Sequence, residues 1–350
     1  MSNLLFRLCL PVKYSSFSFL HGYNPPFYFV ANEAAMQIFK SLESVPKGEG
    51  ISLAIGNFDG VHLGHAEIIR ECCSDKSFRT AILTFDIHPR KFLYPEFAPQ
   101  ALTLPYEKYA FFKTLGIDYV IELPFAEYCS IDPLTFLDAL FQNMQLKKIT
   151  IGFNFFFGRG QKGNAELAFW WGRSAGVKIS VVEPFQKNGM RVSSSAIREL
   201  ILSGHIKNAA SLLLYPFLIS GTVQRGRQIG RTLNFPTLNL GTPDKIMPPD
   251  GVYITQTVFD KKQYTSLTNI GTNPTIDAES KQKIIETWVD SEDIGELYGR
   301  KISVYFLKKI RNEIRFSSKE KLAETISHDK EICHKFMESN KIKELPDIFG

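Results

Sequence analysis

The most informative segment of this 350-residue chain is Gly56-Asn57-Phe58-Asp59-Gly60-Val61-His62-Leu63-Gly64-His65. It follows a short apolar strand predicted over 51–55, and a helical pattern begins directly after it. A loop between a strand and a helix start forms the phosphate site of many α/β proteins. Its glycines let backbone amides approach an anion. Its histidines add two imidazole N–H donors where the helix N-terminus already favours negative charge. The segment therefore predicts a site that binds and polarises the phosphates of a nucleotide.

This segment resembles the HxGH signature of the nucleotidyltransferase superfamily, and the preceding Gly-Asn-Phe-Asp-Gly narrows the resemblance to one family. That family is the prokaryotic bifunctional riboflavin kinases/FMN adenylyltransferases, also called FAD synthetases. The resemblance implies that His62 and His65 are catalytic. It also implies nucleotide contacts from five further residues: Gly56, Phe58, Asp59, Gly60 and Gly64. A metal site on the two histidines is a weaker alternative, because no third ligand is placed nearby.

Length and composition suit two globular domains. Apolar residues make up 44% of the chain, and no run of about 18 apolar residues could span a membrane. The net charge of +5 is not gathered into one block, which suits phosphorylated small molecules better than nucleic acid. Five cysteines without a CxxC pair favour a reducing, cytoplasmic setting with no disulfide framework or zinc site. We expect small-molecule substrates, no nucleic acid or membrane partner, and a monomer or weak homo-oligomer.

The first 35 residues differ from the rest of the chain. They are rich in Phe, Tyr and Ser, without a clean helical or strand period. Their apolar run at 4–10 is too short and interrupted for a signal peptide. The family resemblance starts near Met36. We therefore expect residues 1–35 to be an extension, either disordered or the product of a mis-called start codon.

Apolar strands and helical patterns alternate through the N-terminal half. We expect strands over 51–55, 80–85, 118–123, 148–152 and 178–182, with helices such as 106–115 and 133–145 between them. Alternation of this kind predicts a parallel sheet with helices on both faces. The resemblance implies that this Rossmann-like α/β nucleotidyltransferase domain spans 36–204. Ligands in such folds bind at the carboxyl ends of the strands.

Three further segments near expected strand ends resemble motifs of the family. Residues 86–90 resemble Asp-Pro-His-Pro-Arg, with Ile87 in place of the first proline. Residues 152–160 resemble its flavin-side loop, which implies flavin contacts from Asn154 and Phe157. Residues 192–198 resemble Ile-Ser-Ser-Thr-x-Ile-Arg. This last match implies a second phosphate clamp, made by Ser193, Ser194, Ser195 and Arg198.

Each of these motifs has a structural alternative when it is taken alone. The serines at 193–195 are also typical of a helix N-cap. His88, in the first of the three segments, is equally consistent with a structural histidine. The aromatic residues around Asn154 are also consistent with ordinary core. The functional interpretation rests on four motifs in the family's order, each near a strand end.

The C-terminal half has a different pattern. A helical stretch over 205–214 predicts a linker helix within 205–215, and strand-like segments then recur at 217–223, 251–258, 264–270, 283–289 and 301–306. Turn residues separate these segments. The pattern predicts a small, mostly antiparallel barrel or sandwich over 216–350, closed by a helix over 319–338.

The motif of this half resembles the riboflavin kinase signature that ends in Pro-Thr-x-Asn, here at 236–239. The resemblance implies that Mg²⁺ is bound by Thr237 and Asn239, whose neutral oxygens suit this cation. It also implies that Glu286 accepts the proton of riboflavin's hydroxyl during phosphoryl transfer. ATP phosphates would lie at Gly221, Gly226 and Gly230, and Arg311 would contact the flavin. Two departures are Asn234 for the usual glycine and Trp288 for a position that is often histidine.

Together these resemblances imply two reactions that both consume ATP. The C-terminal domain would phosphorylate riboflavin to FMN with Mg-ATP, and the N-terminal domain would adenylylate FMN to FAD and release pyrophosphate. The first nucleophile is a neutral alcohol that benefits from a base, whereas FMN's phosphate is already largely ionised. Two alternatives are a different acceptor for the N-terminal domain and a flavin-binding protein with decayed sites. The riboflavin kinase motifs and the intact site residues argue against them.

Overall fold

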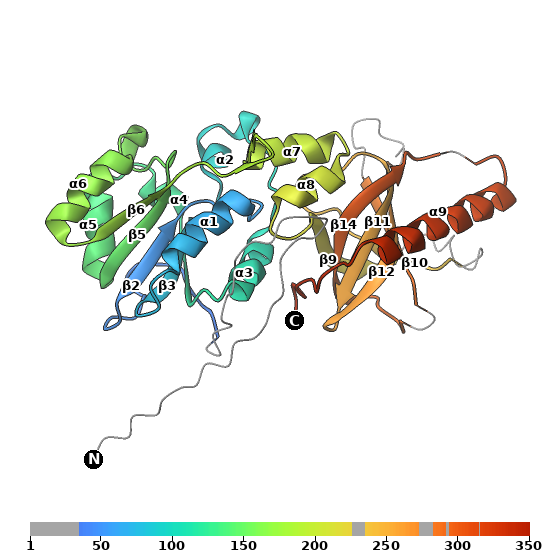
Figure 1. Cartoon of the computed structure of the whole chain (residues 1–350), viewed down its shortest axis with the longest axis horizontal. Coiled ribbons are helices and arrows are strands. Elements are labelled where there is room, and N and C mark those ends of the chain that lie inside the picture. The colour runs from blue at the N-terminus through green and yellow to red at the C-terminus, as the bar shows by residue number, and fades with distance from the viewer. Residues whose placement is uncertain (1–34, 226–234, 273–282, 292–293, 315) are drawn as a thin grey trace, which may run out of the picture.

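The computed structural model describes residues 35–225, 235–272, 283–291, 294–314 and 316–350. Figure 1 shows an α/β unit and a barrel side by side, with α7 (Ser194–Leu202) and α8 (Ile206–Leu212) near their junction. No helix within these ranges is both long and apolar enough to cross a membrane. Gly226, Gly230 and Asn234 lie outside the described residues, as does the extension over 1–34.

The α/β unit is built on a six-stranded sheet in the order β1-β4-β3-β2-β5-β6, in which every pairing is parallel. The five strands expected from the sequence are present. The sixth, at one edge, is only three residues long, so its alternation is too brief to recognise. The strands are β1 (Gln37–Phe39), β2 (Ile51–Ile55), β3 (Arg79–Phe85), β4 (Tyr119–Leu123), β5 (Leu146–Gly152) and β6 (Lys178–Val182).

Helices cover both faces of this sheet, as the alternation predicts. On one face Ala54, Ile82 and Val120 pack against α1 and α3, and on the other Leu53 and Ile121 pack against α5 and α6. Strands buried on both faces read as continuous apolar runs, which is why the sequence revealed them. The helices are α1 (Leu63–Cys72), α2 (Pro89–Leu93), α3 (Pro105–Thr114), α4 (Phe125–Tyr128), α5 (Pro133–Asn143), α6 (Ala165–Ala175) and α7 (Ser194–Leu202).

The strand order reverses at β2, which has β3 on one side and β5 on the other. Ligands of open α/β sheets bind outside the carboxyl ends of the strands at such a reversal. The loop over 56–62 leaves β2 at this point, and the loop over 153–158 leaves β5 beside it. The topology therefore places two of the predicted motifs next to each other.

The C-terminal unit is a closed antiparallel barrel in the order β10-β13-β12-β11-β14-β9, so the barrel alternative is confirmed. Buried hydroxyls link three neighbouring strands: the Oγ1 atoms of Thr255 and Thr268 lie 2.9 Å apart, and those of Thr268 and Thr287 lie 3.0 Å apart. Such cross-strand pairs help to fix the register. The strands are β9 (Leu218–Gln224), β10 (Thr237–Leu240), β11 (Gly251–Phe259), β12 (Lys262–Thr272), β13 (Lys283–Val289) and β14 (Lys301–Arg311).

A terminal helix, α9 (Lys319–Ser339), lies across the outside of the barrel (Figure 1). Its Cys333 and Phe336 pack against Val252 and Leu267 of the strands. Ser318 caps this helix by accepting a hydrogen bond from the backbone N–H of Lys321. The predicted closing helix is therefore confirmed.

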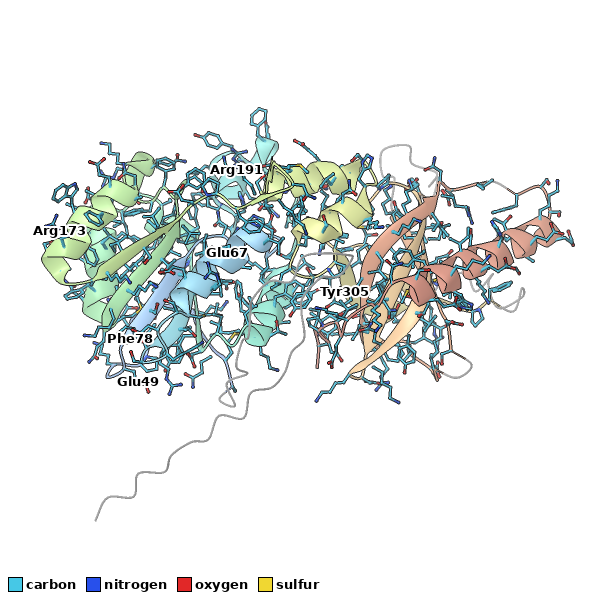
Figure 2. All side chains as sticks on the ribbon, viewed as in Figure 1. Glu49, Glu67, Phe78, Arg173, Arg191 and Tyr305 are labelled. Atoms are coloured by element: carbon cyan, nitrogen blue, oxygen red, sulfur yellow. The ribbon has the colours of Figure 1, made fainter. Side chains whose placement is uncertain are left out.

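The two units meet over a shared apolar surface. The short helix α8 (Ile206–Leu212) buries Ile206 and Leu212 in the same cluster as barrel residues. Tyr305 of β14, labelled in Figure 2, is fully buried where the barrel adjoins the α/β unit. A short hairpin of β7 (Gln186–Lys187) and β8 (Met190–Arg191), which the sequence pattern did not predict, precedes α7.

Candidate active sites

The loop after β2 is tightly packed against its surroundings. The backbone N–H of Gly56 donates to the carbonyl oxygen of Leu83 at 3.1 Å. Phe58 has a φ of +50°, and its ring is fully buried. Gly60 has a φ of +85°, and an added Cβ there would lie 2.7 Å from a methyl carbon of Leu102. A glycine is required at position 60, because a larger residue would be strained and would also collide.

The two histidines of the loop lie at the start of α1. His62 caps this helix: its Nδ1 accepts a hydrogen bond from the backbone N–H of His65 at 3.2 Å. In a neutral imidazole with an accepting Nδ1, the proton is on Nε2. The two rings stack with their centroids 3.6 Å apart. An added Cβ at Gly64 would lie 3.2 Å from the His62 ring, so this glycine leaves room for the stack.

Burial keeps both imidazoles neutral. It lowers the pKa of His62 to about 3, and it lowers the pKa of His65 well below the ordinary value. The charges of His62, when protonated, and of Lys108 push the pKa of His65 further down. At neutral pH the pair therefore contributes N–H donors and lone pairs rather than positive charge. The Nδ1 of His65 is buried and has no hydrogen-bond partner among the described residues.

The predicted phosphate clamp contacts the loop after β2, although Arg198 of the clamp lies 139 positions after Asp59 of the loop. The guanidinium of Arg198 pairs with the carboxylate of Asp59, and both side chains are largely buried. Asp59 also accepts from the backbone N–H groups of Leu102, at 2.9 Å, and Thr103, at 3.1 Å. The Nε of Arg198 donates to the carbonyl oxygen of Gln100 at 2.7 Å. Asp59 and Arg198 are therefore partners of each other and hold the site together.

The serines of the clamp have different environments. Ser193 caps α7 by accepting from the backbone N–H of Ala196 at 3.2 Å, as the N-cap alternative states. Ser194 instead donates to the carbonyl oxygen of Asp59 at 2.9 Å, which ties α7 to the loop after β2. Ser195 is exposed at the first turn of the helix. The structure thus brings the motif at 192–198 into contact with the motif at 56–65.

Two further side chains belong to this region. His88 caps α2 by accepting from the backbone N–H of Arg90 at 3.1 Å. Burial lowers its pKa, and the charges of Asp59 and Arg198 act on it, so it lies beside the clamp. Lys108 of α3 is only 9% exposed and donates to the carbonyl oxygen of Asn57 at 3.3 Å.

Lys108 was absent from the sequence prediction. One signal could have revealed it: it lies three, four and seven positions before the apolar residues Phe111, Phe112 and Leu115. This spacing places the lysine on the buried face of α3. A lysine on a buried face is rare unless it has a partner or a function.

The two predicted residues of the loop after β5 differ in exposure. Asn154 is exposed. Phe157 is only 8% exposed and packs against Phe136, with the ring centroids 5.8 Å apart. Its ring therefore belongs to the core, as the structural alternative states. The more exposed rings of this loop are those of Phe153 and Phe156.

A second group of predicted site residues lies on the outer wall of the barrel. Thr237 and Asn239 are two residues apart on β10, so both point to the same face. Asn239 is paired with Glu286 of β13, and Glu286 is paired in turn with Asn269 of β12. The register thus aligns three polar side chains across neighbouring strands. Gly221 lies on β9, and an added Cβ there would meet no atom of the described residues within 4 Å.

Helix α9 borders this outer wall. Arg311, at the end of β14, donates to both carboxylate oxygens of Asp329 at 2.7–3.1 Å. The ammonium of Lys330 lies 4.0 Å from the ring centroid of Trp288 and 4.3 Å from that of Phe235. Arg311 is therefore held by a buried carboxylate of α9, and Trp288 faces a cation of the same helix.

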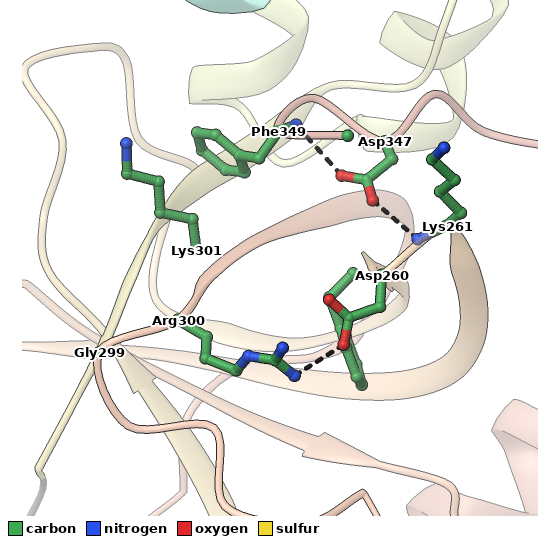
Figure 3. A pocket seen from close by; sticks show the side chains of 9 residues that line it. Asp260, Lys261, Gly299, Arg300, Lys301, Asp347 and Phe349 are labelled. Atoms are coloured by element: carbon green, nitrogen blue, oxygen red, sulfur yellow. Dashed lines mark hydrogen bonds and ion pairs between the residues drawn. The ribbon is translucent and has the colours of Figure 1, made fainter.

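One open cavity lies apart from both groups of predicted site residues, that of the α/β unit and that of the barrel. It has a volume of about 590 Å³ and is found at the end of the barrel that the C-terminus reaches (Figure 3). Arg300 donates to Asp260 at 2.7 Å across its wall, and the backbone N–H of Lys261 donates to Asp347 at 2.8 Å. None of its nine lining residues is a predicted site residue.

Family models match both halves of the chain. Residues 45–196 match FAD synthetase, and residues 213–337 match riboflavin kinase. With the parallel sheet and the closed barrel, these matches define a class of protein: a two-domain transferase that acts on flavins and their nucleotides.

Relatives with both halves narrow this class. The bifunctional riboflavin kinase/FMN adenylyltransferase of Escherichia coli strain K12 is 33% identical over 302 residues, which cover 85% of this chain and 95% of the relative. The enzyme of Bacillus subtilis is 33% identical over 80% of this chain and 90% of its own. The chain belongs to the family of bifunctional riboflavin kinase/FMN adenylyltransferases.

A solved structure has the same fold. It is described as a macrolide-efflux protein from Streptococcus pneumoniae, is 27% identical and superposes with a TM-score of 0.76. The match covers 85% of this chain and 98% of that protein. The likeness concerns the arrangement of the two units.

The family membership settles the two reactions. The C-terminal domain phosphorylates riboflavin to FMN with ATP, and the N-terminal domain adenylylates FMN to FAD with release of pyrophosphate. The alternative of a different acceptor is set aside, because the second half matches riboflavin kinase.

Proposed function

We propose that the two transfers take place at two separate sites, one in each unit. Adenylyl transfer would occur over the loop 56–65 and the start of α7. Phosphoryl transfer would occur on the outer wall of the barrel around Glu286. The first assignment rests on the contacts that Ser194 and Arg198 make with Asp59. These contacts join two motifs that are distant in sequence, at the point where the strand order reverses.

Adenylyl transfer needs no general base, because the attacking phosphate of FMN is already largely ionised. It needs alignment of the reactants and stabilisation of charge on the α-phosphate and the departing pyrophosphate. The neutral His62 has an Nε2–H to donate, since its Nδ1 already accepts. The backbone amide of Gly64 and the hydroxyl of Ser195 would supply further donors. The N–H groups of Gly56 and Gly60 already donate to Leu83 and Thr103, so these two glycines would instead let the phosphates approach the loop closely.

Phosphoryl transfer begins from a neutral hydroxyl, so a carboxylate base is useful. Glu286 would accept this proton. The oxygens of Thr237 and Asn239 fit Mg²⁺, because they are hard, neutral ligands on one face, next to a carboxylate. Bound Mg²⁺ would neutralise charge on the phosphates of ATP. Gly221, which has no described atom within 4 Å of an added Cβ, would let these phosphates approach the backbone, as would Gly226 and Gly230.

The flavin contacts are assigned with one change of role. Asn154 would contact the flavin directly from the loop after β5. Phe157 would support that loop from the core, while Phe153 and Phe156 offer exposed rings. Arg311 would act at the kinase site in the orientation that Asp329 imposes on it.

The remaining assignments follow from the family pattern. We propose domain limits of 36–204 and 216–350, with 205–215 as the connection, and we expect a chain that starts at Met36 to keep both activities. The enzyme would work in the cytoplasm, as a monomer or weak homo-oligomer.

Paired variants test the two-site proposal. His62→Ala combined with His65→Ala should abolish FAD formation while FMN still accumulates from riboflavin. Glu286→Gln keeps the shape of glutamate but cannot take a proton. It should slow FMN formation by about 10²–10⁴-fold and leave FAD formation from supplied FMN nearly unchanged.

The measurement is chromatography of flavins formed from riboflavin or FMN with Mg-ATP. The exposed residues His328 and Glu296 provide matched controls as His328→Ala and Glu296→Gln, which should leave both activities unchanged. Loss of both activities in a histidine variant that stays folded would refute two separate sites. Near-normal kinase turnover in Glu286→Gln would show that the base lies elsewhere.

A further inference from the structure

Lys108 is a buried cation that has no ionic partner in the part of the chain that the structure describes. Its side chain is 9% exposed, and its single hydrogen bond among the described residues runs to the carbonyl oxygen of Asn57, at 3.3 Å. No described carboxylate lies within 4.0 Å of its Nζ. An ammonium group carries three donors, so two of them have no protein acceptor in the described residues.

The nearest carboxylates are already engaged. Asp59 and Glu122 both act on the pKa of Lys108 from a distance, opposing the larger effect of burial, which lowers it. Asp59 pairs with Arg198, and Glu122 pairs with Lys40 and accepts from Tyr109. Neither carboxylate is therefore available to neutralise Lys108.

The ammonium group lies within the adenylyl-transfer region. It contacts the loop after β2 through Asn57, and its charge lowers the pKa of both His65 and His88. Arg198 is the cation that the sequence predicted for phosphate binding, but its charge is neutralised by the ion pair with Asp59. The histidines are neutral. Apart from the exposed Arg90 at the rim, Lys108 is therefore the uncompensated positive charge of this region within the described residues.

Such an arrangement destabilises the unliganded protein. Removing an ammonium group from water without a paired anion is costly, so buried lysines normally have an acidic partner. The neighbouring Glu107 shows the usual solution, because its carboxylate is 2.7 Å from the ammonium of Lys245. An unpaired cation persists most readily where a ligand supplies the missing anion.

We propose that Lys108 binds the phosphate groups of the adenylyl-transfer reaction, contacting the α-phosphate and the pyrophosphate as it departs. This inference rests on the proposed location of that reaction at the loop after β2. It gives the site a cation, complementary to the negative charge that develops during transfer. A competing role is purely structural, with Lys108 serving only to hold the carbonyl of Asn57.

The test replaces the charge with an apolar side chain of similar length, Lys108→Met, in the full chain. Lys113→Met is the matched control, because Lys113 lies on the same helix and is exposed. Four quantities are measured: FAD formation from FMN and ATP, FMN formation from riboflavin, binding of inorganic pyrophosphate by calorimetry, and the Tm of the unliganded protein.

We expect Lys108→Met to lower kcat/KM for FAD formation by roughly 10²–10³-fold, as removal of one preorganised donor does. Pyrophosphate binding should weaken by roughly tenfold or more. FMN formation should not change, and Tm should stay equal or rise, because an unpaired buried charge is gone. Lys108→Arg, which keeps the charge, should recover part of both losses.

Two results would overturn the inference. One is unchanged FAD formation and pyrophosphate binding in Lys108→Met. The other is a lower Tm together with no recovery in Lys108→Arg, which would assign the structural role. The His62→Ala and His65→Ala double variant, run in parallel, separates this failure from a failure of the proposed site. If that variant also keeps FAD formation, the site itself lies elsewhere.

Discussion

A single buried side chain, His62, has two roles at the start of α1. Its Nδ1 caps the helix, so its Nε2 carries the proton and can donate. The capping role requires the neutral ring, because a protonated Nδ1 could not accept from the backbone N–H of His65. Burial enforces this state by holding the pKa at about 3. The chemistry of the site and the stability of the helix therefore share one protonation state.

The first prediction concerns the pH dependence of stability. The pKa of His62 is about 3 when folded and near its ordinary 6.5 when unfolded, so the unfolded chain binds the extra proton between these values. The stability from the neutral ring is full above 6.5 and is lost as pH falls toward 3. Between pH 7 and pH 5 this loss is about 2 kcal/mol. His62→Asn keeps the capping acceptor but does not titrate, so its Tm should fall less than that of the parent protein.

Thermal unfolding at pH 7 and pH 5 measures this difference. The exposed His328 provides the control as His328→Asn, which should follow the parent protein. An equal fall in Tm for His62→Asn and the parent would mean that His62 is not the titrating group.

At the scale of elements, the segment after α9 has a role that the sequence pattern did not predict. It returns from the barrel to the α/β unit and buries Leu345 and Ile348 in a cluster that also contains Phe111 of α3. The backbone N–H of Leu345 donates to Gln263 at 3.0 Å, and Tyr305 donates to the carbonyl oxygen of Pro346 at 2.7 Å. This segment therefore links the two units as well as ending the chain.

The second prediction tests this link. Leu345 is 4% exposed, so Leu345→Ala should destabilise the protein by about 2–4 kcal/mol, through lost burial and the cavity left behind. Leu202→Ala removes the same atoms from a side chain that is 57% exposed, and should change stability by less than about 0.5 kcal/mol. Denaturant unfolding of both variants is the measurement. Equal effects would show that the segment does not pack as described.

At the scale of the whole molecule, a buried ion pair joins the two units. Lys245 donates to Glu107 of α3 at 2.7 Å and to the carbonyl oxygen of Leu218 at 3.0 Å, and both charged side chains are fully buried. Glu107 also accepts from Ser220 of the barrel. Removal of one partner leaves the other charge buried and uncompensated, which is far more harmful than loss of both.

The third prediction follows from this asymmetry. Lys245→Met should destabilise the protein by about 3–5 kcal/mol, and adding Glu107→Gln should restore part of the loss. The pair Lys91–Asp244 also joins the two units, at 3.1 Å, but it is exposed, so Lys91→Met should have little effect. Thermal unfolding of these three variants and of Glu107→Gln alone is compared with the parent. Purely additive losses in the double variant would contradict a coupled buried pair.

Local patterns in the sequence were sufficient for the architecture. The largely apolar run 51–55 predicted a parallel strand with its observed bounds, because a strand covered on both faces needs few polar positions. The edge strand at 178–182 was also predicted with its observed bounds, although it is only partly covered. Capping residues marked helix starts, as Ser193 does for α7. Short-range rules failed for the brief strands β1 and β10, where too few residues alternate to give a signal.

The motif residues and the two reactions were also readable from the sequence, because glycines, histidines and hydroxyls stand at fixed spacings around a strand end. Only the tertiary structure showed what those residues contact. It paired Asp59 with Arg198, moved Phe157 into the core and brought Lys108 to the loop after β2. These outcomes depend on the register of distant elements and on what each side chain meets there. Spacing along the chain carries no record of such long-range contacts, whereas burial and charge at a site are determined by them.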